Sequence, residues 1–114
     1  MEYEIKNGKG KIKEYNYNGE LEFEGEYLNG ERNGKGKEYD YHGKLEFEGE
    51  YLNGKRNGKG KEYYFNGKLQ FEGEYLNGKR WNGKGKEYYS NGILKYEGEF
   101  NRGRFKLKKN LDFI

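Results

Sequence analysis

Short runs of alternating apolar and polar residues, separated by glycine-containing turns, follow one another along the whole chain. In LQFEGEY, residues 69–75, every second position is apolar or glycine. A period of two is typical of a β-strand with one face against apolar neighbours and the other in water. The runs are too short for helices, so the pattern predicts an all-β protein with no helix longer than about two turns before residue 104.

The same run recurs at a nearly constant interval. The aromatic residue near its start is Phe23, Phe47, Phe71 and Tyr96, in steps of 24, 24 and 25 residues, and Trp81 is the extra residue in the last step. Such self-similarity indicates a stack of modules that bury their apolar faces against one another. We expect a half-repeat at 1–8, repeats at 9–30, 31–54, 55–78 and 79–103, and a cap at 104–114. Within the cap, Phe105 to Lys109 is expected to form a closing strand, with a short amphipathic segment as the alternative.

Each repeat contains a turn signal between two alternating runs, namely Asn18-Gly19, His42-Gly43, Asn66-Gly67 and Asn91-Gly92. An Asn-Gly pair favours a two-residue type I′ turn, because both central residues of that turn need positive φ. With the turn at residues 66–67, Lys61 faces Glu72 and Lys59 faces Glu74 across the hairpin. A turn longer by one residue would exchange the two faces of the sheet.

This register divides the side chains between two faces. One face carries ladders of Lys and Glu, with Tyr63 and Phe65 near the turn, and is expected to face water. The other carries an apolar stripe, which in the third repeat consists of Leu69, Phe71 and Tyr75, with Gly58, Gly60 and Gly73 leaving room for the rings. A single-layer sheet has no second layer to cover such a stripe fully, and exposed apolar surface marks interaction sites.

The composition is consistent with a repeat stack rather than with a two-layer globular domain. Only 31% of the 114 residues are hydrophobic and 38% are charged, with a mean hydropathy of −1.47. Disorder is the alternative for such a composition, but 13 Tyr and 18% aromatic residues argue against it. The net charge of +3 is too small for a basic nucleic-acid-binding surface, so no nucleic-acid partner is expected.

The polar residues do not predict catalysis. The glycine-rich NGKGK segments lack the spacing of a phosphate-binding loop and precede no helix. Glu72 and Glu74 form a carboxylate pair, but the pair recurs in every repeat and faces lysines, unlike a unique active site. His42 is the only histidine and there is no cysteine. We therefore expect neither enzyme activity, nor a metal site, nor a cofactor.

The chain resembles MORN-repeat proteins. The resemblance rests on FEGEYLNGKRNGKG at residues 47–60, which follows the family pattern aromatic-x-Gly-x-aromatic, then Gly, then Gly-x-Gly. It covers residues 1–103. The segment GKLQFEG is one residue longer than in common units, and KEYY is similar to a variant class in bacterial proteins named as antitoxin components. The resemblance implies an elongated, twisted, single-layer antiparallel sheet of stacked hairpins that serves in scaffolding, protein binding or phospholipid attachment.

The leading functional hypothesis is a non-catalytic scaffold that binds a peptide, a helix or a second copy of the chain through its aromatic stripe. The expected contact residues are Phe47, Tyr51, Phe71, Tyr75, Tyr96 and Phe100, together with Trp81, whose ring either anchors a partner or folds back on neighbouring tyrosines. The Lys and Glu side chains already face each other with opposite charges, so they present no net electrostatic field that could attract a partner.

The alternative is a peripheral module for anionic membranes. Its basic residues would be Arg102, Arg104, Lys106, Lys108 and Lys109, with Phe105 and Leu107 as apolar contacts. Each basic residue would contribute about 1 kcal/mol at an anionic surface. A third hypothesis, an antitoxin component, rests on the variant class alone. The chain shows no signal peptide or membrane span, so a cytoplasmic location is expected, with peripheral membrane association under the lipid hypothesis.

Overall fold

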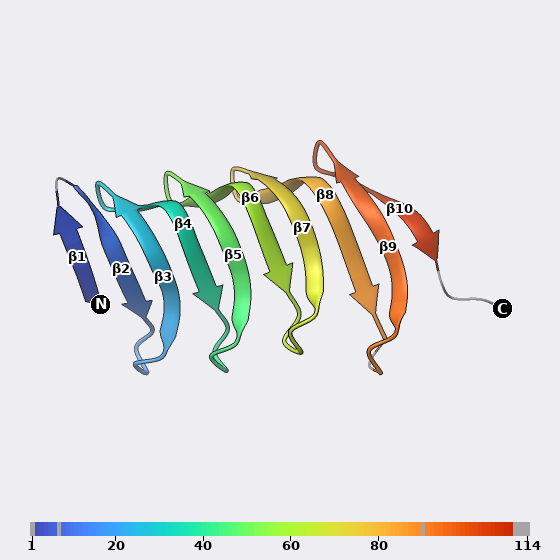
Figure 1. Ribbon diagram of the computed structural model, residues 1–114, viewed down its shortest axis with the longest axis horizontal. Helices are drawn as coiled ribbons and strands as arrows, with labels where there is room; N and C mark the ends of the chain where they lie inside the picture. Colours follow the sequence, from blue (N-terminus) through green and yellow to red (C-terminus); the bar gives the residue numbers. More distant parts are fainter. Residues whose placement is uncertain (1, 7, 90, 111–114) are drawn as a thin grey trace.

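The computed structural model describes residues 2–6, 8–89 and 91–110, and these residues form one open antiparallel sheet (Figure 1). Each strand pairs with the strands before and after it in sequence, so the chain is a succession of hairpins. The sheet measures 58 × 31 × 16 Å. The ten strands are β1 Glu2–Lys6, β2 Lys9–Tyr15, β3 Leu21–Leu28, β4 Glu31–Tyr39, β5 Leu45–Leu52, β6 Lys55–Tyr63, β7 Leu69–Leu76, β8 Lys79–Tyr88, β9 Leu94–Asn101 and β10 Arg104–Asn110.

The all-β, single-layer architecture expected from the alternating pattern is confirmed. The described residues contain no helix, and the closing strand expected at Phe105 to Lys109 lies within β10. The predicted register in the middle of the hairpins is also confirmed, because Lys61 faces Glu72 and Lys59 faces Glu74. The period-two pattern therefore identified the correct pairing of these strands.

The predicted type I′ turn at residues 66–67 is wrong. The amide of Gly67 donates to the carbonyl of Tyr64, and the amide of Tyr64 donates to the carbonyl of Lys68, both at 2.8 Å. Within this loop only Gly67 has positive φ, at 86°. The connection is thus a three-residue loop, in which a tight turn is followed by a left-handed glycine.

The longer loop does not exchange the faces, because a β-bulge in β7 compensates for the extra residue. Glu62 pairs with Phe71, but Tyr63 pairs with Leu69, so Gln70 is left without a partner residue across the ladder. Tyr63 remains on the Lys/Glu face, where its hydroxyl donates to Glu48 at 2.9 Å. Two departures from regular pairing cancel, and the faces predicted for Tyr63, Phe71 and Tyr75 are correct despite the wrong turn. The face predicted for Leu69 is wrong, because its pairing with Tyr63 across the bulge places it on the Lys/Glu face.

True two-residue turns occur at the opposite edge of the sheet. Asn53 and Gly54 both have positive φ, at 51° and 83°, and Leu52 pairs with Lys55. The same geometry occurs at Asn29-Gly30, Asn77-Gly78 and Arg102-Gly103. We call this edge the turn margin, and we call the edge formed by the loops between β2 and β3, β4 and β5, β6 and β7, and β8 and β9 the loop margin.

A row of glycines crosses the middle of the sheet. Gly60 and Gly73 face each other on β6 and β7. A Cβ atom on Gly60 would lie 2.7 Å from the ring of Phe47, and one on Gly73 would lie 2.1 Å from the carbonyl oxygen of Asn82. The glycines therefore provide the space that the aromatic rings occupy on one side of the sheet.

The inserted Trp81 changes the pairing of β7 with β8. In the β5–β6 hairpin, three residues of β6 lie opposite one residue of β5, which is a surplus of two. In the β7–β8 hairpin the surplus is one residue, Trp81, which lies between the pairs Tyr75–Arg80 and Glu74–Asn82. The β7–β8 ladder has moved by two residues relative to its counterpart, so Gly73 faces Gly83 instead of Gly85. The segment GKGK has a period of two, and the slip therefore still matches glycine with glycine and Lys with Glu.

We predict that Gly73→Val is far more destabilising than Lys59→Gln. The valine side chain has no space beside β8, and overpacking of this kind costs about 1–3 kcal/mol, whereas an exposed charge contributes within about 0.5 kcal/mol. Urea denaturation of the two variants measures the difference. Equal losses of unfolding free energy would show that the glycine row is not tightly packed.

We further predict that Asn53→Val costs about 2 kcal/mol, because a β-branched side chain is strained at positive φ. Asn66→Val should cost less than about 1 kcal/mol, because it removes one exposed hydrogen bond, to the amide of Lys68. Thermal unfolding of both variants tests the turn assignment. The reverse order of stability would contradict it.

Candidate interaction surface

The aromatic face of the sheet is a continuous row of interlocked rings. Phe23, Phe47 and Phe71 are fully buried, and Tyr51 and Tyr75 are nearly so. Neighbouring rings meet edge to face, with centroids 5.1 Å apart for Phe47 and Tyr75 and 5.4 Å apart for Phe71 and Tyr75. This packing joins each repeat to the next.

An arginine from each following hairpin covers the buried phenylalanine. The guanidinium carbon of Arg56 lies 4.1 Å from the centroid of the Phe47 ring. The same guanidinium donates to both carboxylate oxygens of Glu38, at 2.9 and 3.0 Å. Glu38 also accepts a hydrogen bond from the hydroxyl of Tyr51. The charged groups satisfy one another while their flat surfaces shield the rings from water.

This Arg–Glu–Tyr unit occurs three times. Its members are Arg32, Glu14 and Tyr27, then Arg56, Glu38 and Tyr51, then Arg80, Glu62 and Tyr75. Arg56 also lies 3.3 Å from Glu62, so the second unit contacts the third. The sequence analysis missed the unit, although its members recur every 24 residues and the predicted register already placed Glu62 opposite Phe71.

Partial burial of the unit shifts the pKa values of its members. Burial alone would raise the pKa of Glu38, but the hydrogen bonds from Arg56 and Tyr51 outweigh it and hold that pKa below its ordinary value. The pKa values of Glu14 and Glu62 are lowered in the same way. Burial and the hydrogen bond to Glu38 together raise the pKa of the Tyr51 phenol far above its ordinary value.

The structure places the predicted partner-binding residues in two groups. Phe47, Tyr51, Phe71 and Tyr75 are buried under the arginines, so the expectation that this part of the stripe is exposed is wrong. Tyr96, Phe100 and Trp81 are partly exposed. Trp81 lies beside the last turn, where a Cβ atom on Gly103 would be 3.5 Å from its ring. The accessible members of the predicted set therefore belong to the last repeat.

The cover of the aromatic face ends in the last repeat because two residues of the unit are replaced. Phe100 takes the place of the tyrosine and Phe105 that of the arginine, and their rings pack with centroids 5.1 Å apart. Glu87, in the place of the glutamate, accepts a hydrogen bond from the hydroxyl of Tyr96. The guanidinium of Arg80 still lies 5.4 Å from the centroid of the Phe100 ring, but Phe105 stands where a further arginine would continue the cover. As a result, 45% of Phe105 and 48% of Leu107 are exposed.

The slip of β8 opens a small cavity at the same end. Gly85, rather than Glu87, lies opposite Phe71. The cavity has a volume of about 210 Å³, and its lining includes Tyr64, Gln70, Tyr96, Phe100 and Phe105. The combination of rings with a few polar groups is suited to receiving an apolar side chain.

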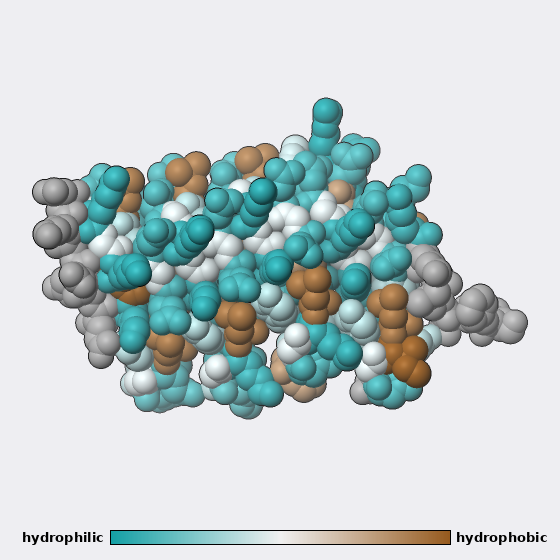
Figure 2. All heavy atoms as spheres, viewed as in Figure 1, coloured by the Kyte–Doolittle hydropathy of each residue, from teal (hydrophilic) through white to brown (hydrophobic). Residues whose placement is uncertain are grey.

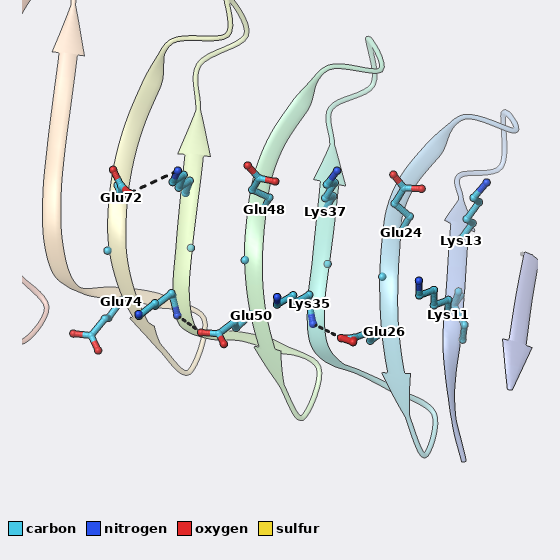
Figure 3. A pocket seen from close by; sticks show the side chains of 18 residues that line it. Lys11, Lys13, Glu24, Glu26, Lys35, Lys37, Glu48, Glu50, Glu72 and Glu74 are labelled. Atoms are coloured by element: carbon cyan, nitrogen blue, oxygen red, sulfur yellow. Dashed lines mark hydrogen bonds and ion pairs between the residues drawn. The ribbon is translucent and has the colours of Figure 1, made fainter. Parts of the chain in front are cut away.

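The opposite face is an open groove with a glycine floor. It spans β2 to β7, has a volume of about 1480 Å³, and is flanked by Lys and Glu side chains (Figure 3). Seen in space-filling form, this face shows a pale central band between hydrophilic side chains, with apolar patches towards its edges (Figure 2). The register predicted a series of facing Lys–Glu pairs on this face. Among the described side chains, the pair that forms an ion pair is Lys61 with Glu72, at 3.7 Å.

Other carboxylates on this face hold the backbone at the bulges. Glu26 accepts a hydrogen bond from the amide of Lys35 at 2.8 Å, and Glu50 accepts one from the amide of Lys59 at 2.7 Å. The hydroxyls of Tyr39 and Tyr63 donate to Glu24 and Glu48, and burial together with these hydrogen bonds raises the pKa of each phenol to about 12. The Lys/Glu face thus stabilises the strand pairing.

The basic residues proposed for lipid binding lie apart from the apolar residues of the same strand. Arg102, Arg104, Lys106 and Lys108 are exposed, and the Lys109 side chain lies outside the described residues. Lys106 pairs with Glu99 across the ladder, and the ammonium group of Lys108 lies 3.1 Å from the Glu99 carboxylate. Phe105 points to the aromatic face, where it meets Phe100. No described residue belongs to a helix able to cross a membrane.

Comparison with protein families identifies the repeats. A family model described as MORN repeat matches residues 23–44 and 47–68, and one described as MORN repeat variant matches residues 81–102. The matched segments coincide with the recurring hairpins, and the chain belongs to the MORN-repeat family. MORN repeats generally act as interaction modules for proteins or membranes and are typically non-catalytic. None of the curated proteins compared with the chain matches it significantly.

We predict that stability is constant between about pH 5 and pH 9 and falls on both sides. The glutamates have lowered pKa values in the fold, so they stabilise it above about pH 4.3 and lose this effect as the pH falls. The phenols have raised pKa values, so their contribution is complete below about pH 10 and is lost as the pH rises.

Urea midpoints measured across the pH range test this profile. Tyr51→Phe should be less stable than the native chain at neutral pH, because Glu38 loses a hydrogen bond. Its stability should also fall less steeply above about pH 10. An unchanged alkaline slope in this variant would contradict the role given to the Tyr51 phenol.

Proposed function

We propose that this chain is a non-catalytic interaction module that binds an extended segment of a partner protein by adding it as a strand beside β10. The observation that carries this proposal is the replacement of the covering arginine by Phe105 on β10, which leaves Phe105 and Leu107 exposed. There the aromatic face ends in partly exposed rings and a cavity, whereas the preceding rings are buried within the stack. The proposal locates the partner at Tyr96, Phe100, Phe105 and Leu107, with Trp81 nearby.

The edge of the sheet supports strand addition as the mode of binding. Among the described residues, β10 pairs only with β9, so the outer side of its backbone can pair with another strand. Peptide addition to a sheet edge obtains affinity from backbone hydrogen bonds and specificity from alternate side chains. An apolar side chain of the added segment would lie beside Phe105 and Leu107 and reach the cavity.

The charge pattern of the sheet indicates the chemistry of the partner segment. Strands with glutamate on the Lys/Glu face alternate with strands that carry lysine there, as Glu99 on β9 and Lys106 on β10 illustrate. A strand beside β10 would continue the alternation if it carried acidic residues next to Lys106 and Lys108. The favoured partner segment therefore alternates apolar and acidic residues.

The anionic-lipid hypothesis places Phe105 and the lysines of β10 against the same surface. The geometry favours it less, because these groups point to opposite faces of the strand and Lys108 is paired with Glu99. Flotation with vesicles of phosphatidylcholine and phosphatidylserine distinguishes the two hypotheses. Binding to these vesicles that is lost in a Lys106→Gln/Lys108→Gln variant would favour the membrane.

We predict that a fluorescent peptide of the pattern Phe-Glu-Val-Glu-Tyr, flanked by polar residues, binds with micromolar affinity in an anisotropy titration. Leu107→Lys and Lys106→Glu should each weaken binding by about tenfold, because one removes an apolar contact and the other reverses a charge. A Phe65→Ser variant, changed at the loop margin, is the matched control. Absence of binding, or equal binding by all variants, would reject strand addition at β10.

A further inference from the structure

Three exposed aromatic residues form a row along the loop margin. Tyr17, Tyr41 and Phe65 are each the first residue of their three-residue loop. Their exposed fractions are 98%, 74% and 73%. The fourth loop contributes Ile93, which is also exposed. None of these side chains takes part in the buried aromatic row of the sheet. The three rings, and Ile93 at the end of the fourth loop, together present apolar surface along this margin.

The spacing of this row is set by the sheet. Successive loops are separated by two strands, which corresponds to about 9.5 Å. The loops follow one another along one long edge of the molecule (Figure 1). A partner that contacts every loop must present contact groups at the same spacing. A second copy of this chain meets this requirement, because its own loops have that spacing.

Charge is distributed unevenly along the same edge. Near the first loop lie Glu20 and Glu22, and near the second lie Asp40, Lys44 and Glu46. Near the third and fourth loops the charged residues are Lys68 and Lys95. The loop margin is therefore acidic towards β2 and basic towards β9. Two copies in antiparallel orientation bring the acidic half of each opposite the basic half of the other.

The turn margin lacks this self-complementarity. Its exposed leucines are Leu52 and Leu76. The residue after each two-residue turn is Glu31, Lys55, Lys79 and Arg104 in succession, so three of these four positions are basic. Two copies joined along this margin would bring like charges together, which disfavours association. Of the two margins, the loop margin is the one whose charges match a second copy.

We infer that two copies of this chain associate side by side through their loop margins, antiparallel and related by a two-fold axis between the second and third loops. The second loop of one copy then meets the third loop of the other, with Tyr41 beside Phe65 and Glu46 near Lys68. The first loop meets the fourth, with Tyr17 beside Ile93. Four loops from each copy make a narrow interface at the low end of the usual size range, so the dimer is weak and reversible.

The oligomeric state of the full chain as a function of concentration tests this inference. Static light scattering should show the mass rising from 13.6 kDa towards twice that value as the concentration approaches about 1 mM. The double variant Tyr41→Ser/Phe65→Ser should weaken dimerisation by at least about tenfold. The matched control Leu52→Ser/Leu76→Ser, altered at the turn margin, should leave it unchanged. A chain that stays monomeric at this concentration, or loss of the dimer in the control alone, would overturn the inference.

A charge exchange tests the antiparallel orientation. Glu46→Lys and Lys68→Glu should each weaken the dimer about tenfold, and the double variant should restore it, because the two residues meet across the axis. Failure of the double variant to restore the dimer would reject this pairing of loops. Leu107→Lys should not alter the dimer, which separates this surface from the strand addition proposed at β10.

Discussion

The stability of this sheet depends on placing an arginine guanidinium over a phenylalanine ring. A single layer of strands has no second sheet or helix to exclude water from its apolar side. The Arg56 guanidinium on Phe47, held by Glu38, provides that cover from within the chain. The glycine row is its necessary counterpart, because the Phe47 ring lies in space that any side chain on Gly49 or Gly60 would occupy. The high charge content of the sequence and its small hydrophobic fraction are therefore both consistent with a folded chain.

The same cover separates the structural from the accessible part of the aromatic face. Where the three Arg–Glu–Tyr units are complete, rings that resemble a binding stripe in the sequence are internal packing residues. Where phenylalanines replace the tyrosine and the arginine, at Phe100 and Phe105, the face is open. The recognition properties of the protein thus arise from local departures from its repeat. Identical repeats alone would have presented a uniform surface.

Much of the fold could be predicted from the sequence, because period-two alternation and a fixed repeat determine the pairing of strands. The turn at residues 66–67 could not be assigned correctly from the Asn-Gly pair, since the chain contains several such pairs. Those with the two-residue geometry lie at the turn margin, at residues 29–30, 53–54 and 77–78. The position of Glu62 beside Phe71 was implicit in the predicted register. Its pairing with Arg80 was not, because that arginine reaches it from the next hairpin.

The number of surplus residues near the turn margin differs between hairpins, which shows that the sheet tolerates insertions and deletions there. The β1–β2 hairpin has no surplus residue, the β3–β4 and β5–β6 hairpins have two each, and the β7–β8 hairpin has one together with a two-residue slip. A single inserted codon in a strand ordinarily turns every later side chain to the wrong side of a sheet. Here the GKGK segment can shift by two positions and still match glycine with glycine and Lys with Glu, although Phe71 then faces Gly85 instead of Glu87. Insertions and deletions at this point can therefore be inherited without loss of the fold, and each one is free to create a new local surface.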